Sequence, residues 1–166
     1  MKTILMIAAT QLIIIAAFSQ PISGTYAIKN AETGIFLRIK DANTSNGTPI
    51  VAYSPVNWKC VTWDFKHIDS NTYQLANLFS GKTFQPDQAP KDKVTLEEQP
   101  LTSGAGNQQY EFIPVQKGLY LIRLKGTALY LTPSDNKGTV NAPVMLTKKN
   151  NSRLQYWTLQ EQHPTM

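Results

Sequence analysis

The sequence predicts an all-β domain of three equivalent units, because the chain matches itself at an offset of 47 residues and shows no helical periodicity after residue 19. Aromatic residues recur at two places in every unit: Tyr26, Tyr73 and Tyr120, then Trp63, Tyr110 and Trp157. Short alternating stretches separated by turn-forming residues fill the rest. The units, at residues 24–69, 70–116 and 117–162, are each too short to bury a core alone, so they must share one.

Residues 1–19 stand outside the repeat and have the pattern of a cleavable secretion signal. Lys2 supplies a positive start, an apolar run covers residues 4–18, and Ala17-Phe18-Ser19 puts small residues at the two positions that a signal peptidase reads. The run is shorter than the roughly 20 apolar residues of a membrane span, and no basic segment follows it. We therefore expect cleavage before Gln20 and export, to the extracellular space or a periplasm, with no lipid anchor and no membrane span.

About 147 residues remain, 20–166, which is enough for one domain and too few for a separate catalytic one. Without Lys2, fifteen basic residues face eleven acidic ones, and this charge of +4 is spread over all three units. Such a spread is typical of a solvated surface, so we expect no nucleic-acid partner. Cys60 is the only cysteine, so no internal disulfide can form, and burial as a small apolar residue is expected.

Each unit is predicted to contain four strands. In the first unit they are 25–29, 36–39, 49–53 and 62–67. A turn at 31–34 joins the first two, and a polar loop at 41–47 precedes the third.

The other two units repeat this pattern. The second has predicted strands at 73–75, 83–85, 94–98 and 109–113, and the third at 120–122, 129–131, 144–147 and 156–159. Open sheet edges are a liability, and three equal quartets remove them if each gives two strands to a closed barrel and two to a cap. The predicted architecture is therefore a β-trefoil of twelve strands.

The last strand of each unit carries a motif that resembles the Gln-x-Trp signature of ricin-type β-trefoil lectins. The motif reads Gln108-Gln109-Tyr110 and Gln155-Tyr156-Trp157, while Val61-Thr62-Trp63 keeps the aromatic residue without the Gln. The unit opening at 24–28 and the loop at 46–50 resemble the same family, so the likeness covers the whole chain after residue 19. The resemblance implies a carbohydrate-binding module that needs no metal, cofactor or catalytic group.

The motif also has a structural reading that is independent of the family. An aromatic ring on the last strand can pack into the shared interior, and a Gln amide two residues earlier can donate to and accept from the backbone of a loop. Trp63, Tyr110 and Trp157 are therefore expected in the core. The same holds for the tyrosines at the unit openings, provided that each phenol finds a hydrogen-bond partner.

Two aromatic residues, Tyr53 and Trp58, occur in the first unit alone, so the repeat does not require them. At the offset of 47 their counterparts are Pro100 and Thr147 for Tyr53, and Ala105 and Ser152 for Trp58. Rings of this kind can stack on the apolar face of a pyranose while amides bind its hydroxyls. Tyr53, Asn57 and Trp58 are thus the predicted contact surface, and Tyr53 matches the family's stacking position. The alternative is that both rings only cover the edge of the barrel.

The resemblance further implies an Asp on the second strand of each active unit. That position holds Arg38, Gln85 and Thr132, so no unit keeps the carboxylate, and the family's sugar preference does not carry over. The second unit retains polar residues at the other matching positions, and the third has residues that suit packing. The candidate ligand-binding residues beside the aromatic pair are Arg38, Asp41, Gln85, Glu98, Asn107 and Gln108. For Asp41, and for Asp135 at the same place in the third unit, turn capping is the commoner role.

Few residues are suited to catalysis. His67 and His163 lack the spacing of a metal site, and Glu97 and Glu98 are neighbours on one strand and so point to opposite faces. We therefore expect a non-enzyme. A protease-inhibitor-like module presenting loops 54–59, 85–91 and 100–107 is the competing hypothesis, and an exported scaffold without a ligand is a third. The divergence of the three units favours a monomer.

Overall fold

The computed structural model describes residues 20–166, and the expected signal segment lies outside the described residues. The first unit contains β1 (Thr25–Asn30), β2 (Phe36–Ile39), β3 (Ile50–Tyr53) and β4 (Thr62–Asp69), with short 3-10 helices η1 (Lys40–Ala42) and η2 (Lys59–Val61). The second contains β5 (Thr72–Asn77), β6 (Thr83–Pro86), β7 (Val94–Gln99), η3 (Gly106–Gln108) and β8 (Tyr110–Gln116). The third contains β9 (Leu119–Leu124), β10 (Leu129–Pro133), β11 (Val144–Lys148), η4 (Arg153–Gln155) and β12 (Tyr156–Glu161). All twelve predicted strands are present. No helix between residues 20 and 166 is long and apolar enough to cross a membrane.

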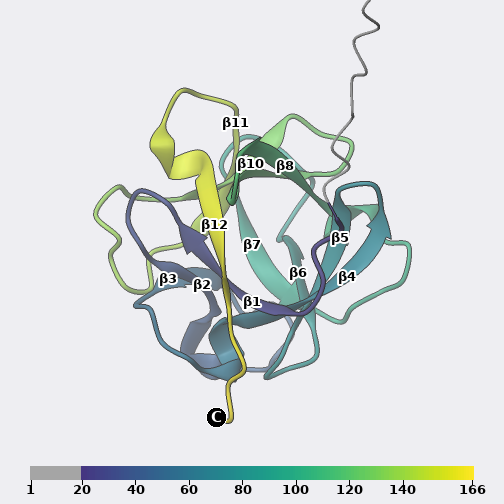
Figure 1. Ribbon diagram of the computed structural model, residues 1–166, viewed down its shortest axis with the longest axis vertical. Coiled ribbons are helices and arrows are strands. Elements are labelled where there is room, and N and C mark those ends of the chain that lie inside the picture. The colour runs from purple at the N-terminus through teal and green to yellow at the C-terminus, as the bar shows by residue number, and fades with distance from the viewer. Residues whose placement is uncertain (1–19) are drawn as a thin grey trace, which may run out of the picture.

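The first and last strands of the three units form a closed barrel. The antiparallel pairs run in a ring, β1 with β4, β4 with β5, β5 with β8, β8 with β9, β9 with β12, and β12 with β1. In Figure 1 the yellow β12 lies beside the purple β1, where the third unit meets the first. This closure leaves no free edge in the barrel, as the β-trefoil prediction requires.

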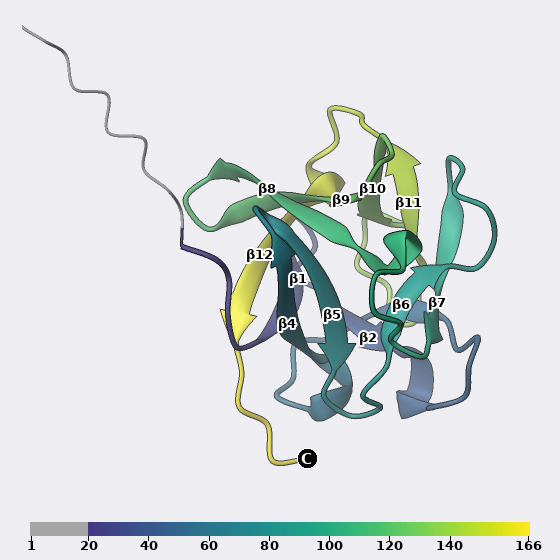
Figure 2. The same cartoon turned by 90° about the vertical axis from the view of Figure 1, so that its right-hand side faces the viewer.

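The two middle strands of each unit form a hairpin, and the three hairpins form a cap. The hairpins are β2–β3, β6–β7 and β10–β11. They contact one another through the β11–β7 pairing and through the bridges Pro49 to Glu97 and Val51 to Pro143. Figure 2 shows two of them, β6–β7 and β10–β11, to the right of the barrel strands β12, β1, β4 and β5. The predicted β-trefoil is confirmed.

The recurrent aromatic residue on the last strand of each unit occupies the core. Trp63, Tyr110 and Trp157 are all 0% exposed. Each donates a hydrogen bond to a backbone carbonyl 26 residues earlier, on the second strand of its own unit. The acceptors are Leu37 for Trp63 (3.2 Å), Phe84 for Tyr110 (3.2 Å) and Leu131 for Trp157 (2.9 Å). Burial with a satisfied polar atom confirms the predicted structural role.

The tyrosines that open the units behave less uniformly. Tyr73 is buried, and its hydroxyl accepts a hydrogen bond from the Ile22 N–H (2.9 Å). Tyr26 is half-buried and donates to the Ser23 carbonyl (3.0 Å). Tyr120 is also half-buried, and its hydroxyl has no hydrogen-bond partner within the described chain. The expectation of a partner therefore holds for two of the three.

The hairpin register corrects one correspondence drawn from the sequence. Residues on the two strands of each hairpin face each other as follows: Phe36 with Tyr53, Thr83 with Gln99, and Tyr130 with Thr147. Phe36, Thr83 and Tyr130 are 47 residues apart and so occupy equivalent positions. The residue that faces Thr83, Gln99, is therefore the counterpart of Tyr53 in the second unit, and the assignment of Tyr53 to Pro100 was wrong. The second hairpin is one residue shorter, and the segment before β8 restores the offset. A constant offset in sequence cannot detect two compensating length changes.

Candidate functional site

The structure brings Arg38, Tyr53 and Trp58 together on the outer face of the first hairpin, and we call these three residues the first-unit cluster. Arg38 on β2 and Tyr53 on β3 point to the same side, and the guanidinium carbon of Arg38 lies 3.9 Å from the centroid of the Tyr53 ring. This is the geometry of a cation–π contact. The Tyr53 and Trp58 ring centroids are 6.1 Å apart at an interplanar angle of 34°. The sequence predicted the aromatic pair but not that Arg38 would cover a face of Tyr53.

The two rings of the cluster differ in accessibility. Tyr53 is half-buried and packs on a small apolar cluster made by Ala27, Phe36, Cys60 and Val61. Trp58 is 37% exposed. Because Arg38 already occupies one face of Tyr53, Trp58 offers the more accessible surface for stacking. The burial of Cys60 in this cluster confirms its predicted role as a small apolar residue.

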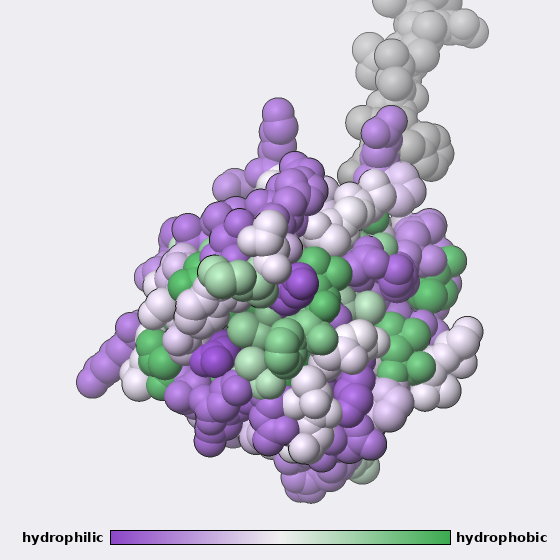
Figure 3. Space-filling model, turned by 90° about the horizontal axis from the view of Figure 1, so that it is seen from below, coloured by the Kyte–Doolittle hydropathy of each residue, from purple (hydrophilic) through white to green (hydrophobic). Residues whose placement is uncertain are grey.

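Trp58 also borders a shallow apolar cavity of about 270 Å³. Its other walls come from Ala42, Lys59, Cys60, Phe79 and Met166. Viewed from below Figure 1, the end of the molecule where the chain terminates carries a patch of apolar side chains within a polar surface (Figure 3). Asn57 is exposed next to Trp58 in sequence, so an amide is available beside the ring.

In the second unit, the Gln of the Gln-x-Trp motif binds the loop before β8. Gln108 is buried; its Oε1 accepts from the Thr102 N–H (2.8 Å) and its Nε2 donates to the Pro100 carbonyl (3.0 Å) and to Gln85 Oε1 (2.9 Å). The predicted role of this amide is confirmed. Its hydrogen-bonding groups are engaged within the protein.

The third unit uses its Gln in the same way. Gln155 Oε1 accepts from the Asn150 N–H (3.0 Å), and Nε2 donates to the Lys148 carbonyl and to Thr147 Oγ1, both at 2.9 Å. Thr147 and Thr132 share a buried hydrogen bond of 2.8 Å. The polar groups on this face of the third unit are therefore engaged with one another.

In the first unit, where Val61 replaces the motif Gln, a residue from the end of the chain supplies the missing amide. Gln162 is buried, its Nε2 donates to the Val56 carbonyl (2.8 Å), and its Oε1 accepts from Thr62 Oγ1 (2.7 Å). The Gln162 N–H also donates to the Thr25 carbonyl (3.0 Å). The loop that carries Trp58 is thus held by a residue about a hundred positions away, which no local pattern in the sequence indicates.

We expect Gln162→Ala to lower the free energy of unfolding by about 1–3 kcal/mol, because it removes the donor of the partly buried Val56 carbonyl and the acceptor of the buried Thr62 hydroxyl. Urea denaturation measures the change. Gln160, two residues earlier and exposed, provides the matched control, and Gln160→Ala is expected to change stability by less than about 0.5 kcal/mol. Equal effects of the two substitutions would contradict the anchoring role of Gln162.

The polar candidates of the second unit do not converge on one surface. Asn107 is exposed, while Gln85 is half-buried and bound to Gln108. Glu98 is 0% exposed and faces the interior opposite Phe84. We therefore leave Glu98 and Gln108 out of the proposed contact surface. The sequence could not show which face of its strand Glu98 occupies, because the one-residue shift in this hairpin exchanges the faces.

Asp135 and Asp41 differ although they occupy equivalent positions. Asp135 Oδ1 accepts from the backbone N–H groups of Lys137 (2.9 Å) and Gly138 (3.0 Å), which confirms turn capping. Burial raises the pKa of Asp135, but hydrogen bonds from Thr139, Lys137 and Gly138 together hold that pKa below its ordinary value. Asp41 is exposed and has a positive φ of 54°, and its carboxylate accepts no hydrogen bond from the described residues. Its carboxylate is available to a ligand.

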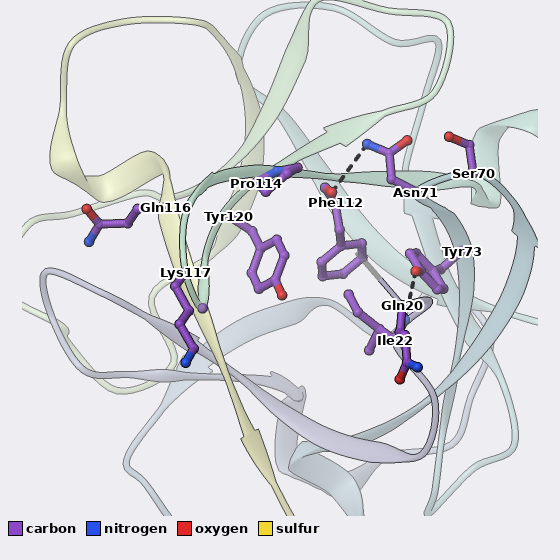
Figure 4. A pocket seen from close by; sticks show the side chains of 11 residues that line it. Gln20, Ile22, Ser70, Asn71, Tyr73, Phe112, Pro114, Gln116, Lys117 and Tyr120 are labelled. Carbon is purple, nitrogen blue, oxygen red and sulfur yellow. Dashed lines mark hydrogen bonds between the residues drawn. The ribbon is translucent and has the colours of Figure 1, made fainter. Parts of the chain in front are cut away.

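A second hollow lies at the open end of the barrel and contains none of the predicted ligand residues. Its volume is about 500 Å³. Figure 4 shows the rings of Tyr73, Phe112 and Tyr120 around Ile22, which lies among them. The segment before β1 therefore passes over this end of the barrel core.

The twelve strands and their barrel-and-cap arrangement define a protein of the β-trefoil class. The model of the family described as ricin-type beta-trefoil lectin domain-like matches residues 15–97 and 58–147. The chain belongs to this family. A search of curated proteins found no match.

Solved structures share the fold at low sequence identity. A designed threefold-symmetric protein, ThreeFoil, is 22% identical, with a TM-score of 0.78 over 83% of this chain and 99% of its own. The Rhizoctonia solani agglutinin is 21% identical, with a TM-score of 0.76 over 89% and 100%. The Macrolepiota procera ricin B-like lectin, solved with lactose, is 21% identical, with a TM-score of 0.70 over 86% and 99%. At these identities the likeness establishes the fold.

Proposed function

We propose that this protein is an exported carbohydrate-binding module without catalytic activity, and that glycans contact it at the first-unit cluster. The observation that carries the proposal is the exposed Trp58 ring beside Tyr53, since neither ring is required by the repeat. Membership of the ricin-type lectin-like family supports carbohydrate as the ligand class, as does the similar fold of a lectin solved with lactose. The secretion-signal pattern of residues 1–19 supports export.

The chemistry of the cluster suits a sugar. The exposed face of Trp58 can cover the apolar C–H side of a pyranose, while the Asn57 amide and the Asp41 carboxylate can bind hydroxyls. Each hydrogen bond replaces one to water, so its net contribution is about 0.5–1.5 kcal/mol. A single site of this kind binds weakly. In the other two units, hydrogen-bonded polar side chains occupy the equivalent face in place of an aromatic ring. We propose a monomer with one site and weak affinity.

The test is a glycan-array screen of the purified protein, followed by titration of the best ligand against Trp58→Ala and Tyr53→Ala. We expect Trp58→Ala to weaken binding about tenfold, which corresponds to about 1.4 kcal/mol for a stacked ring, and Tyr53→Ala to weaken it less or equally. Tyr156, a half-buried aromatic residue of the third unit, provides the matched control, and Tyr156→Ala should leave binding unchanged. Unchanged binding in both first-unit variants would move the site elsewhere, and binding to no glycan at all would exclude the lectin function.

A further inference from the structure

Arg38 is the most buried arginine among residues 20–166 and the only one without an ion pair. Arg123 pairs with Glu111 and Arg153 with Glu32, each at 2.6 Å, although both arginine side chains are much more exposed. Arg38 is only 8% exposed, and its Nε is fully buried with no hydrogen-bond partner in the described part of the chain. Buried guanidinium groups are normally paired with an anion, because desolvating an uncompensated charge is costly. The missing partner requires an explanation.

The surroundings of Arg38 orient it without neutralising it. Its guanidinium lies over the Tyr53 ring at 3.9 Å, a contact that fixes the planar group while leaving its N–H donors unused. The other two guanidinium nitrogens of Arg38 make no hydrogen bond within residues 20–166. They are not fully buried either, so they retain contact with solvent. A preorganised pair of donors therefore reaches the surface over the ring of Tyr53, which itself neighbours Trp58.

The local charge favours an anionic ligand over a neutral one. Between residues 36 and 63, which include both hairpin strands and the Trp58 loop, the basic residues are Arg38, Lys40 and Lys59, and the only acidic residue is Asp41. Residues 20–166 carry a net charge of +4, which also favours the approach of an anion.

We propose that the first-unit cluster recognises an acidic sugar: the carboxylate of a uronic acid or sialic acid residue binds Arg38 while its ring lies on Trp58. This inference rests on the proposed carbohydrate-binding function and assigns the specificity of that site. A carboxylate is the natural partner because its two oxygens match the planar fork of a guanidinium. The ligand carboxylate would supply the negative charge that no residue of the described chain places beside Arg38.

The experiment compares ligands that differ in charge alone. Binding of oligogalacturonate and of sialyllactose is measured against the methyl ester of each, with a sulfated galactan and its unsulfated parent as a third pair. We expect at least one carboxylate ligand to bind tenfold or more tightly than its neutral partner, since charge-assisted hydrogen bonds are the strong ones. Raising the salt concentration should narrow this difference.

Three variants assign the effect to Arg38. Arg38→Gln should remove the preference by weakening the acidic ligand alone, and Arg38→Lys should retain part of it, because it keeps the charge and loses the fork. Trp58→Ala should weaken the acidic and neutral ligands alike. Thermal melts verify folding, and Arg38→Gln is not expected to melt earlier, because it removes an uncompensated buried charge.

The possible failures can be told apart. Equal binding of acidic and neutral ligands, or a preference for acidic ligands that survives Arg38→Gln, would overturn the acidic-sugar assignment. If binding still depended on Trp58 in that case, the proposed carbohydrate-binding function would stand. A preference for the sulfated galactan alone would overturn the choice of carboxylate. Absence of binding to every glycan would exclude both proposals.

Discussion

Replacing Trp157 with alanine is expected to lower the free energy of unfolding by about 3–5 kcal/mol, which is the cost of removing a large aromatic residue from a packed core. Trp157 is 0% exposed, and its indole N–H donates to the Leu131 carbonyl at 2.9 Å, so the substitution leaves both a void and an unsatisfied buried acceptor. Because the stability of a domain is typically about 5–15 kcal/mol, this is a large fraction of the total. Urea denaturation, followed by circular dichroism, measures the loss.

The chain contains a matched control for this substitution. Trp58→Ala removes the same side chain from a position that is 37% exposed, and we expect it to cost less than about 1 kcal/mol. Trp157→Phe keeps most of the side-chain volume, so its loss of stability should lie between those of Trp157→Ala and Trp58→Ala. It can still be measured if Trp157→Ala does not fold. Equal losses for the two alanine variants would contradict the assignment of Trp157 to the shared core and Trp58 to the surface.

Replacing Glu98 with leucine is expected to stabilise the protein by about 1–3 kcal/mol at neutral pH, because it removes a buried carboxylate that lacks hydrogen-bond partners. Neither carboxylate oxygen has a partner of ordinary geometry in the described structure. The hairpin register shows what the fold prefers at this place. Glu98 faces Phe84 as Ala52 faces Leu37 in the first unit and Leu146 faces Leu131 in the third, so the other two units carry apolar residues there.

The gain should depend on pH in a defined direction. Burial raises the pKa of Glu98, and the Ser80 hydroxyl and the Lys82 charge offset this only in part. A carboxyl group whose pKa is higher in the folded state binds its proton more tightly there. The protonated Glu98 carboxyl therefore favours the folded state at low pH, and this contribution to stability is lost as the pH rises from the unfolded-state pKa through the folded-state pKa. The advantage of Glu98→Leu should be smallest in acid, near pH 4, and should reach its full size at neutral pH.

Melting temperatures measured between pH 4 and pH 8 test this prediction. Glu97 lies next to Glu98 on the opposite face, is half-buried, and accepts a hydrogen bond from Gln99 Nε2 (2.8 Å). Glu97→Leu is the control and should give no comparable stabilisation, because that carboxylate is partly solvated and partnered. A pH-independent gain for Glu98→Leu, or destabilisation at neutral pH, would show that Glu98 is not an uncompensated buried acid.

The candidate site was predictable only in part. Tyr53 and Trp58 could be identified because they break a repeat, which marks residues that the fold does not need. The resemblance made Arg38 a candidate residue as well, but its stacking on Tyr53 could not be identified, because a cation–π contact depends on where side chains point after the hairpin closes. The constant offset made Glu98 a candidate ligand residue, but Glu98 lies in the interior. The prediction failed because a one-residue difference in hairpin length reverses the faces of a strand.

The sequence alone determined the features that each unit repeats: twelve strands, three units and an aromatic core residue on every fourth strand. These follow from local periodicity and from residue types that recur at a fixed spacing, both of which are visible along the chain. Tertiary structure alone decided that Gln162 replaces the amide missing at Val61, and that Arg38 has no carboxylate partner within residues 20–166. Both features depend on contacts between segments that the fold brings together. Gln162 contacts Val56 across more than a hundred residues, and Arg38 contacts a ring on the next strand. Such contacts exist only once the barrel and the cap have formed.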